Sequence, residues 1–371
     1  MKIHCQRENL LQGIQTVSKA ISPKNTLPIL GGVLMIAKEN GLTLRATDLD
    51  IAIECLVPAD VVEAGALVIA DGRRFLALVQ QLPEDVIEIS QINDYDANVV
   101  YAASSFHIRG LEQEQFPVLP GLEGEQQGSI AGAAFAKLVR QIGIAAATEE
   151  SRPLLTGILL DIKETELVMV ATDSHRLTYG KCQWQADFTT QVVIPAKTML
   201  EVARLAAAEE TVEVTISKHH VCFRMGTTIF ISRTINGTYP DYQPLLPKES
   251  SFSTWLTLEK KGFQNALSRA NLLSTDHNHV VTLDIQPGQM ILSANSAEIG
   301  NIREVLSVQQ TGEPLKVGYN ARYLLDALKV MESEQICFKL TGDASPGILI
   351  PEEGEDYLYL LLPVRIRTYA S

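Results

Sequence analysis

Apolar residues recur at helical spacing in six segments of the chain. Leu11, Ile14 and Val17, for example, fall on one face of a helix that has 3.6 residues per turn. The predicted helices span residues 7–21, 71–82, 132–148, 195–208, 259–274 and 319–331. Between them apolar and polar residues alternate, which indicates strands with one buried face. Each third of the chain therefore has the same order of elements: helix, strands, helix, strands.

The phrase Ala-Thr-Asp occurs twice, each time between an apolar strand and an alternating strand. Asp48 and Asp173 belong to these copies, and a third, altered copy has Asn295 at the position of the aspartates. The intervals are 125 and 122 residues. The second predicted helix of each third gives an interval of 124 residues twice, between Phe75, Met199 and Tyr323. Such constant intervals indicate an internal repeat, and recurring aspartates are expected to fix a common turn.

The repeat predicts an α+β protein of three domains, each with two helices packed on one face of antiparallel sheets. We expect these domains to span residues 1–124, 125–250 and 251–371, with the Pro-rich stretches QFPVLPGLEG and TYPDYQPLLP as connectors. Sheets of this kind leave edges that proteins cover or join. Three domains in a row can continue their sheets edge to edge, and two copies can close a ring through a head-to-tail contact.

Positive charge is concentrated on the predicted helices. The chain has 31 Lys and Arg against 44 Asp and Glu, a net charge of −13. The six predicted helices hold 13 of the basic and 5 of the acidic residues, a net of +8, whereas the remainder carries −21. Two interpretations remain open: solvated helix faces, or a basic surface for the phosphate backbone within an acidic protein.

Composition excludes several classes of protein. Hydrophobic residues make up 46% and charged residues 20%, and no apolar run reaches the roughly 18 residues of a membrane span. The first residues lack the pattern of a signal peptide, so we expect a cytoplasmic protein. Five scattered cysteines, none in a C-x-x-C pair, predict reduced thiols without a disulfide framework or a zinc site. We expect no metal and no cofactor.

The adjacent residues Asp173, Ser174 and His175 invite comparison with a hydrolase triad. Successive side chains of an extended chain point to opposite faces, so these three do not converge on one point. A triad also requires hydrogen bonds from nucleophile to base and from base to orienting group, and no G-x-S-x-G motif surrounds Ser174. The pattern therefore argues against a hydrolase.

Four phrases occur in a specific order: LPIL near residue 29, ATDSHRL near 174, YPDY with LLP near 241, and LLPVR near 363. With the three repeats, they resemble the bacterial sliding clamp family, the beta subunits of DNA polymerase III holoenzymes, over the whole chain. The resemblance implies a head-to-tail homodimer, a closed ring of six domains whose helices line a hole for duplex DNA. It also implies loading by an ATP-driven clamp loader and tethering of the replicative polymerase and repair proteins through short peptides. Such a processivity subunit has no catalytic site.

The resemblance also implies roles for individual residues. A pocket for leucine and phenylalanine anchors would be formed by Leu155, Thr172, His175, Arg176, Leu177, Pro240, Leu245, Leu360, Leu362, Pro363, Val364 and Arg365. Residues facing DNA would be Lys24, Arg73 and Arg152. The basic residues of the predicted helices that we also expect to face DNA are Lys137, Arg140, Lys197 and Arg204. The contact between copies would use Arg74, Phe106, Ile108, Leu272, Leu273, Glu298 and Glu304, with Arg74 opposite Glu298 or Glu304.

The chain departs from the family pattern at several places. Gln243 and Pro244 stand where basic residues are usual after the YPDY phrase, and Ser104 and Ser105 stand where arginines are common. Six residues, IRTYAS, follow Arg365, and we expect them to flank or partly cover the pocket. We therefore expect fewer charged contacts with a bound peptide and between the copies.

Two other functions are weighed against the clamp. One is a three-domain scaffold that binds proteins but does not encircle DNA. The other is a hydrolase that uses Ser174 and His175. Removing the serine hydroxyl would abolish the activity of a hydrolase, whereas a clamp would tolerate the change.

Overall fold

The computed structural model describes residues 1–22, 27–83, 85–120, 126–274, 279–296, 298–353 and 356–366. It divides into two compact units. Unit 1 comprises Met1–Ala133 and Arg204–Thr234, and unit 2 comprises Ala134–Ala203 and Ile235–Ser371. The second domain of the repeat therefore contributes to both units. Lys24, one of the residues predicted to face DNA, lies outside the described residues.

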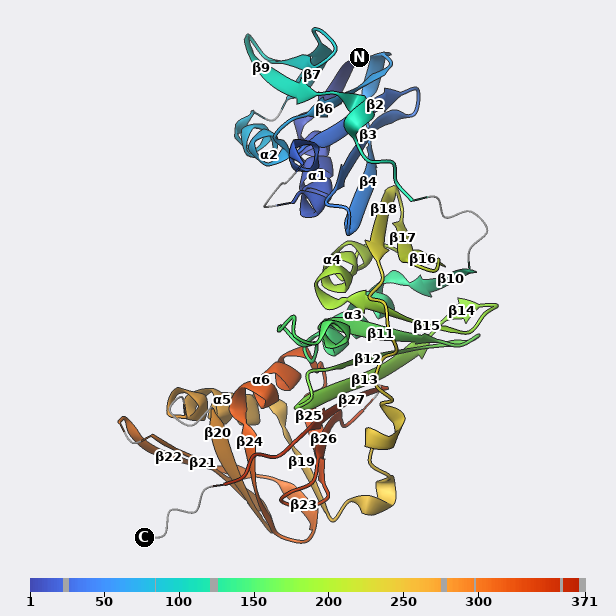
Figure 1. Cartoon of the computed structure of the whole chain (residues 1–371). Helices are drawn as coiled ribbons and strands as arrows, with labels where there is room; N and C mark the ends of the chain where they lie inside the picture. Colours follow the sequence, from blue (N-terminus) through green and yellow to red (C-terminus); the bar gives the residue numbers. More distant parts are fainter. Residues whose placement is uncertain are drawn as a thin grey trace. The chain divides into compact units, whose positions relative to one another are not determined.

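All six predicted helices are present (Figure 1). They are α1 (Arg7–Val17), α2 (Gly72–Gln81), α3 (Gly132–Gly143), α4 (Ala196–Ala206), α5 (Lys260–Leu272) and α6 (Ala321–Val330). The largest difference from the sequence prediction is in α3, which ends at Gly143 rather than at residue 148. None of the helices in the described part of the chain is long and apolar enough to cross a membrane.

Unit 1 is built on one antiparallel sheet. Its strands lie in the order β10 (Gln126–Ala131), β16 (Thr211–Ile216), β17 (His220–Met225), β18 (Thr228–Arg233), β4 (Ile51–Val57), β3 (Gly41–Thr47), β2 (Val33–Lys38), β6 (Gly65–Ile69), β9 (Ser104–Leu111), β8 (Asp96–Tyr101), β7 (Val86–Gln91), β1 (Lys2–Gln6) and β5 (Asp60–Glu63). Helix α1 packs on β3 and β4. Gly13 permits this close packing, because a Cβ atom there would meet the side chains of Val57 and Leu44.

Unit 2 contains two antiparallel sheets. The first has the order β15 (Thr190–Pro195), β11 (Gly157–Ile162), β12 (Glu166–Thr172), β13 (Arg176–Gln183), β27 (Tyr357–Leu361), β26 (Gly347–Pro351), β25 (Gln335–Leu340), β19 (Thr254–Glu259) and β23 (Gln309–Gly312). The second has the order β22 (Gly300–Ser307), β21 (Gln289–Ser296), β20 (Val280–Gln286) and β24 (Leu315–Asn320). The two-residue strand β14 (Gln185–Ala186) follows β13. Helices α5 and α6 pack together, α5 against β20 and β21 and α6 against β24 (Figure 1).

The Thr-Asp phrase forms the same turn in the first two domains, as its recurrence predicts. The Asp48 carboxylate accepts the N–H groups of Asp50 (3.0 Å) and Ile51 (2.8 Å). The Asp173 carboxylate likewise accepts those of His175 (2.9 Å) and Arg176 (3.1 Å). These aspartates therefore fix a structural turn that precedes β4 in one domain and β13 in the other.

In the third domain a serine takes the place of the aspartate. The Ser296 hydroxyl accepts the N–H groups of Glu298 (3.3 Å) and Ile299 (3.2 Å). The alignment of Asn295 with the aspartates is therefore wrong by one residue. The sequence could not reveal this shift, because the capping side chain changed from a carboxylate to a hydroxyl.

Two strand pairs join neighbouring domains, one within each unit. In unit 1, β18 of the second domain pairs antiparallel with β4 of the first, and Ser232 lies opposite Ile51. In unit 2, β27 of the third domain pairs antiparallel with β13 of the second, and Leu361 lies opposite Arg176. The edge-to-edge continuation of sheets that the repeat predicts is therefore present at both joints.

Candidate peptide-binding site

The predicted pocket residues meet around the joint between β13 and β27 in unit 2. Leu155, Leu177 and Leu360 are buried in one apolar cluster, together with Tyr239 and Tyr242. They come from the short helix η4 (Pro153–Thr156), from β13, from β27 and from the YPDY segment. Leu177 and Leu360 lie opposite each other in the strand pair. The cluster thus draws together segments that are distant in the sequence.

Three apolar side chains that lie close in sequence to members of this cluster are exposed to solvent. Leu245 is 52%, Leu362 40% and Val364 36% exposed. Pro240 and Arg365 are also exposed, and Pro363 is half-buried. Exposed apolar residues beside a buried apolar cluster are typical of a groove that binds apolar anchors of a ligand. Their contact with a peptide stays a prediction.

The C-terminal segment of the site is fixed by backbone hydrogen bonds. The Leu362 N–H donates to the His175 carbonyl (3.0 Å), and the Val364 N–H donates to the Gly318 carbonyl (2.8 Å). A Cβ atom at Gly318 would lie 2.6 Å from the Val364 oxygen, so glycine is required for this approach. Ile366 lies near Gly318 as well, and the rest of the IRTYAS extension lies outside the described residues.

Arg176 supports the wall of the site. Its guanidinium donates to the carboxylates of Asp173 (2.9 Å) and Asp326 (2.9 Å) and to the Tyr359 hydroxyl (3.4 Å). It also lies over the Tyr323 ring, 4.3 Å from the ring centroid. Burial lowers the pKa of Arg176, but Tyr359, Asp326 and Asp173 outweigh this effect and raise the pKa, so the side chain stays charged. The resemblance placed Arg176 in the pocket, whereas in the structure its guanidinium is already bound by these carboxylates and by Tyr359.

Asp161 and Tyr242 form a buried hydrogen-bonded pair beside the site. The buried Tyr242 hydroxyl donates to the buried Asp161 carboxylate (3.0 Å). Burial, followed by the hydrogen bond to Asp161, raises the pKa of Tyr242, so the phenol stays protonated as the donor. The Tyr242 ring also packs against Tyr179, with 6.0 Å between ring centroids. This pair anchors the segment that carries Pro240 and Leu245.

Ser174 and His175 do not form a catalytic pair. The Ser174 hydroxyl accepts a hydrogen bond from Arg152 (2.7 Å), and the His175 ring stacks on Tyr323 at 6.5 Å between centroids. Among the described residues no hydrogen bond joins Ser174 to His175. The Thr172 hydroxyl donates to the Arg176 carbonyl (2.7 Å) and accepts the Ser174 N–H (3.2 Å), so it shapes the turn. This geometry lacks the contact between nucleophile and base that a hydrolase requires.

Comparisons with known proteins agree over the whole chain. The family models of the DNA polymerase III beta subunit match as N-terminal domain (residues 1–120), central domain (129–241) and C-terminal domain (243–365). The beta sliding clamp of Bacillus subtilis (strain 168) is 34% identical over 378 residues, which cover 98% of this chain and 100% of the relative. The chain belongs to the bacterial beta sliding clamp family.

Solved structures of family members have the same fold. The DNA polymerase sliding clamp from Bacillus subtilis gives a TM-score of 0.93 at 32% identity, with 99% of this chain and 100% of that chain covered. A sliding clamp from Pseudomonas aeruginosa bound to griselimycin also gives 0.93, at 29% identity and the same coverage. The three clamp domains of this family are therefore present in this chain, and the family is non-catalytic.

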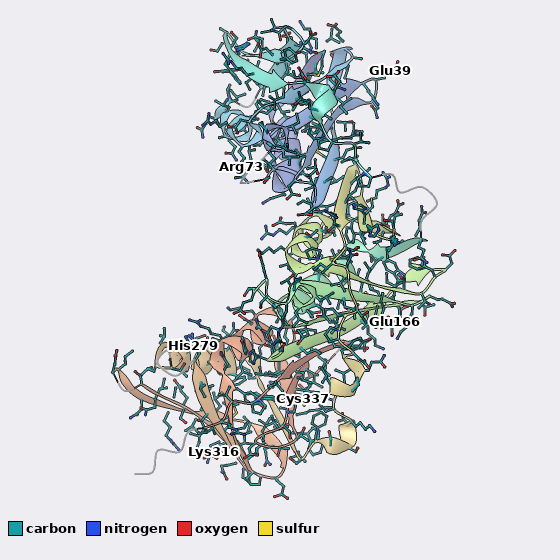
Figure 2. The ribbon with its side chains drawn as sticks, in the orientation of Figure 1. Glu39, Arg73, Glu166, His279, Lys316 and Cys337 are labelled. Atoms are coloured by element: carbon teal, nitrogen blue, oxygen red, sulfur yellow. The ribbon has the colours of Figure 1, made fainter. Side chains whose placement is uncertain are left out.

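Of the basic residues predicted to face DNA, some already have partners in the chain. Lys137 pairs with Glu332 (2.9 Å), and Arg73, labelled in Figure 2, donates to the Ile21 carbonyl (2.9 Å). The Lys137 hydrogen bond lowers the pKa of Glu332. Arg140, Lys197 and Arg204 lie exposed on α3 and α4. Lys137 thus brings less free positive charge to a clamp surface than the sequence suggests.

The residues assigned to the contact between clamp copies lie on both units. In unit 1, Phe106 packs on Tyr101 (6.1 Å between centroids), Ile108 is buried, and the exposed Arg74 pairs with Asp71 (3.2 Å). In unit 2, Leu272 is 69% exposed and Leu273 is half-buried.

Glu304 already has a partner within its own copy. It accepts two hydrogen bonds from Arg269 (2.6 and 2.9 Å), and hydrogen bonding to Arg269 lowers its pKa. The predicted pair of Arg74 with Glu304 therefore competes with an existing ion pair, whereas Glu298 is exposed.

The residues that bind the Arg176 guanidinium were not predicted from the sequence. Asp326 lies 150 residues further along the chain, and Tyr359 lies 183 residues further. Tyr323 was noted only as a marker of the repeat. One signal was present: Asp326 is the single acidic residue in α6, which otherwise carries basic charge.

Proposed function

We propose that two copies of this chain close head to tail into a ring around duplex DNA. In this role it is a processivity subunit in the bacterial cytoplasm, loaded by an ATP-driven clamp loader. The site around Leu177 and Leu360 tethers the replicative polymerase and repair proteins by short peptides. The three domains span about residues 1–124, 125–250 and 251–371.

The observation that carries this proposal is an incomplete third joint. Strands β4, β13 and β22 follow equivalent turns, and β9, β18 and β27 are equivalent late strands. Strand β4 pairs with β18, and β13 pairs with β27. Among the described strands, β22 pairs only with β21, and Ser104–Arg109 of β9 pairs only with β8. The repeat therefore leaves β22 of one copy to pair with β9 of a second copy.

The two existing joints also predict the register of the third. Ile51 and Arg176, each three residues after the capping aspartate, lie opposite the fifth residue of β18 and of β27. The equivalent residue after Ser296 is Ile299, and the fifth residue of β9 is Ile108. Ile299, which is 64% exposed, would then lie opposite Ile108 of the second copy. Glu298 would lie opposite Arg109 of that copy, rather than opposite Arg74.

The charge distribution supports contact with DNA. The six helices as observed carry twelve Lys and Arg and only three Asp and Glu, whereas the chain as a whole has a net charge of −13. Phosphate contacts from such residues are independent of base sequence and weaken with salt. Weak contacts suit a protein that slides, because encirclement provides the retention. Tethering raises the effective concentration of a bound polymerase at the primer end.

Two measurements test the ring. Light scattering should give a mass of about twice 40.7 kDa. After loading, the protein should remain on linear DNA with blocked ends and leave DNA with free ends. A strict monomer, or equal loss from both DNAs, would contradict the proposal. Arg140→Glu with Lys197→Glu separates a clamp from a scaffold, because only a clamp should lose retention on DNA.

The pocket is tested by binding of griselimycin, which is bound to the Pseudomonas aeruginosa clamp. Leu245→Ala and Leu362→Ala each remove an exposed apolar side chain from the site. We expect either change to weaken griselimycin at least tenfold, because a buried Leu side chain contributes about 1.5–3 kcal/mol. Unchanged affinity in both variants would contradict a pocket at this joint.

A further inference from the structure

Ser174 has a backbone conformation that is unusual for a residue with a side chain. Its φ angle is +78°, and it is one of four non-glycine residues of the described chain with positive φ. The left-handed region is disfavoured for such residues by the contact between Cβ and the carbonyl oxygen. Conformations of this kind persist where the surroundings hold them, and they cluster at functional sites.

Arg152 holds this turn from another segment of the site. Its Nη1 donates to the Ser174 hydroxyl at 2.7 Å, which is within the usual range for a hydrogen bond from a charged donor, and both side chains are exposed. The carbonyl of Arg152 accepts the N–H of Leu155 (3.0 Å), so the same residue opens the helix η4 that positions Leu155. We call this connection between Arg152 and Ser174 the clip.

The clip connects the segments of the chain that form the site. On one side it fixes the start of η4, which carries Leu155. On the other side it fixes the turn before His175, and the His175 carbonyl accepts the N–H of Leu362 (3.0 Å). One hydrogen bond therefore links the segments that carry Leu155, Leu177 and Leu362.

The first domain supplies a natural comparison. Leu49 occupies the equivalent turn with a φ of +79°, and its N–H also donates to a threonine hydroxyl, that of Thr47 (3.1 Å). Leu49 has no polar side-chain atom that could accept a hydrogen bond. The Thr-Asp turn thus forms without a clip, and the clip is an addition at the joint that carries the proposed peptide site.

We propose that Arg152 and Ser174 are positioning residues of the peptide pocket, and that the clip sets the spacing of its walls. This inference rests on the proposed function of the site. It assigns Arg152 to the pocket, whereas the family resemblance assigned it to DNA. A bound peptide then gains affinity from a pocket that is already in its binding geometry, since no ordering is required when the peptide binds.

The test measures griselimycin affinity by calorimetry for the full-length chain and its variants. Ser174→Ala and Arg152→Ala each remove the clip, and each should weaken binding about fivefold, the effect of roughly 1 kcal/mol. The double variant should be no weaker than either single variant, because both changes remove the same bond. Ser174→Asn should restore affinity to within about twofold, since asparagine tolerates positive φ and its amide oxygen accepts a hydrogen bond.

Leu49→Ala is the matched control, and it should leave griselimycin affinity unchanged. Losses that multiply in the double variant, or a Ser174→Ala variant that binds as tightly as the unaltered chain, would overturn the inference. If Arg152→Ala weakens retention on DNA and leaves griselimycin affinity unchanged, Arg152 belongs to the DNA surface and the clip has no role. If Leu245→Ala and Leu362→Ala also leave binding intact, the pocket itself is refuted, which is a different failure.

Discussion

Replacing Arg176 with alanine removes a side chain that ties three elements of unit 2 together. The guanidinium extends from β13 to Asp326 on α6 and to Tyr359 on β27, and it closes back on Asp173 in the preceding turn. Its side chain is only 11% exposed, and that of Asp173 is 14% exposed. The substitution therefore tests whether this joint between domains depends on a buried charge network.

The magnitude follows from what the change leaves behind. Removing one partner of a buried ion pair costs roughly 3–5 kcal/mol, because the other charge remains buried without compensation. Here the cost is reduced. Asp173 still accepts two backbone N–H groups, and Asp326, whose side chain is 35% exposed, regains water and keeps Lys329 at 3.6 Å. We expect a loss of about 2–3 kcal/mol in the free energy of unfolding of unit 2.

Tryptophan fluorescence during urea unfolding measures this loss. The chain has two tryptophans, Trp184 and Trp255, and both belong to unit 2. Lys163→Ala is the control, because Lys163 forms an exposed pair with Glu166 (3.6 Å) in the same unit. Exposed pairs of this kind contribute at most about 1 kcal/mol. A loss below about 1 kcal/mol for Arg176→Ala, or an equal loss for Lys163→Ala, would refute the network as a source of stability.

The loss should not depend on pH in the neutral range. The pKa of Arg176 is raised above its ordinary value. A group with a raised folded pKa contributes fully below its unfolded pKa, and the contribution is lost only as the pH rises through the folded value. The difference between the two proteins should therefore be equal at pH 6 and pH 8. Arg176→Lys keeps the charge but lacks the planar donors, and it should recover only part of the loss.

Three further outcomes are expected. Tyr242→Phe leaves the buried Asp161 without its hydroxyl donor, and urea unfolding should show a loss of about 1–3 kcal/mol in the free energy of unfolding. Adding Asp161→Asn should cost less than the sum of the two single losses, because both changes disrupt the same hydrogen bond. Ile299→Lys should weaken the dimer about a hundredfold in analytical ultracentrifugation. Val62 is a similarly exposed residue on β5, and Val62→Lys should leave the dimer unchanged. Burial raises the pKa of Cys5 and of Cys222 to about 11 and that of Cys55 to about 12. In the native protein these thiols should therefore resist iodoacetamide at pH 8 and react faster as the pH rises. All of them should react once urea unfolds the chain. A rapid reaction of these thiols in the native protein at pH 8 would contradict their burial.

Local pattern predicts the elements of this chain well. All six helices follow from apolar spacing, since a helix face repeats every few residues in the sequence itself. The turns at Asp48 and Asp173 follow from the repeat, and both carboxylates accept the expected backbone donors. The third turn was misplaced by one residue, because the sequence does not show that a Ser296 hydroxyl replaces the carboxylate.

The partners of charged side chains could not be predicted in the same way. Lys137 pairs with Glu332, and Arg176 pairs with Asp326, 150 residues away. Such pairs depend on which helices and strands become neighbours, and no local pattern records that choice. A resemblance names the positions of a family site, yet it does not say which charges remain available. Arg152 and Glu304 illustrate this point, since each already binds a partner in its own chain.

The proposed ring uses the same kind of joint between domains three times, and its third use differs in a way that matters for function. Within the chain, β4–β18 and β13–β27 connect domains that the backbone also links. The proposed β22–β9 joint has no covalent link, so it is the joint at which a ring can open for loading. Its stability then depends on exposed apolar residues such as Ile299 and Leu272. Because Glu304 already pairs with Arg269 in its own chain, it is less available for an ion pair across that joint. The strength of the ring should therefore respond more to apolar substitution than to salt.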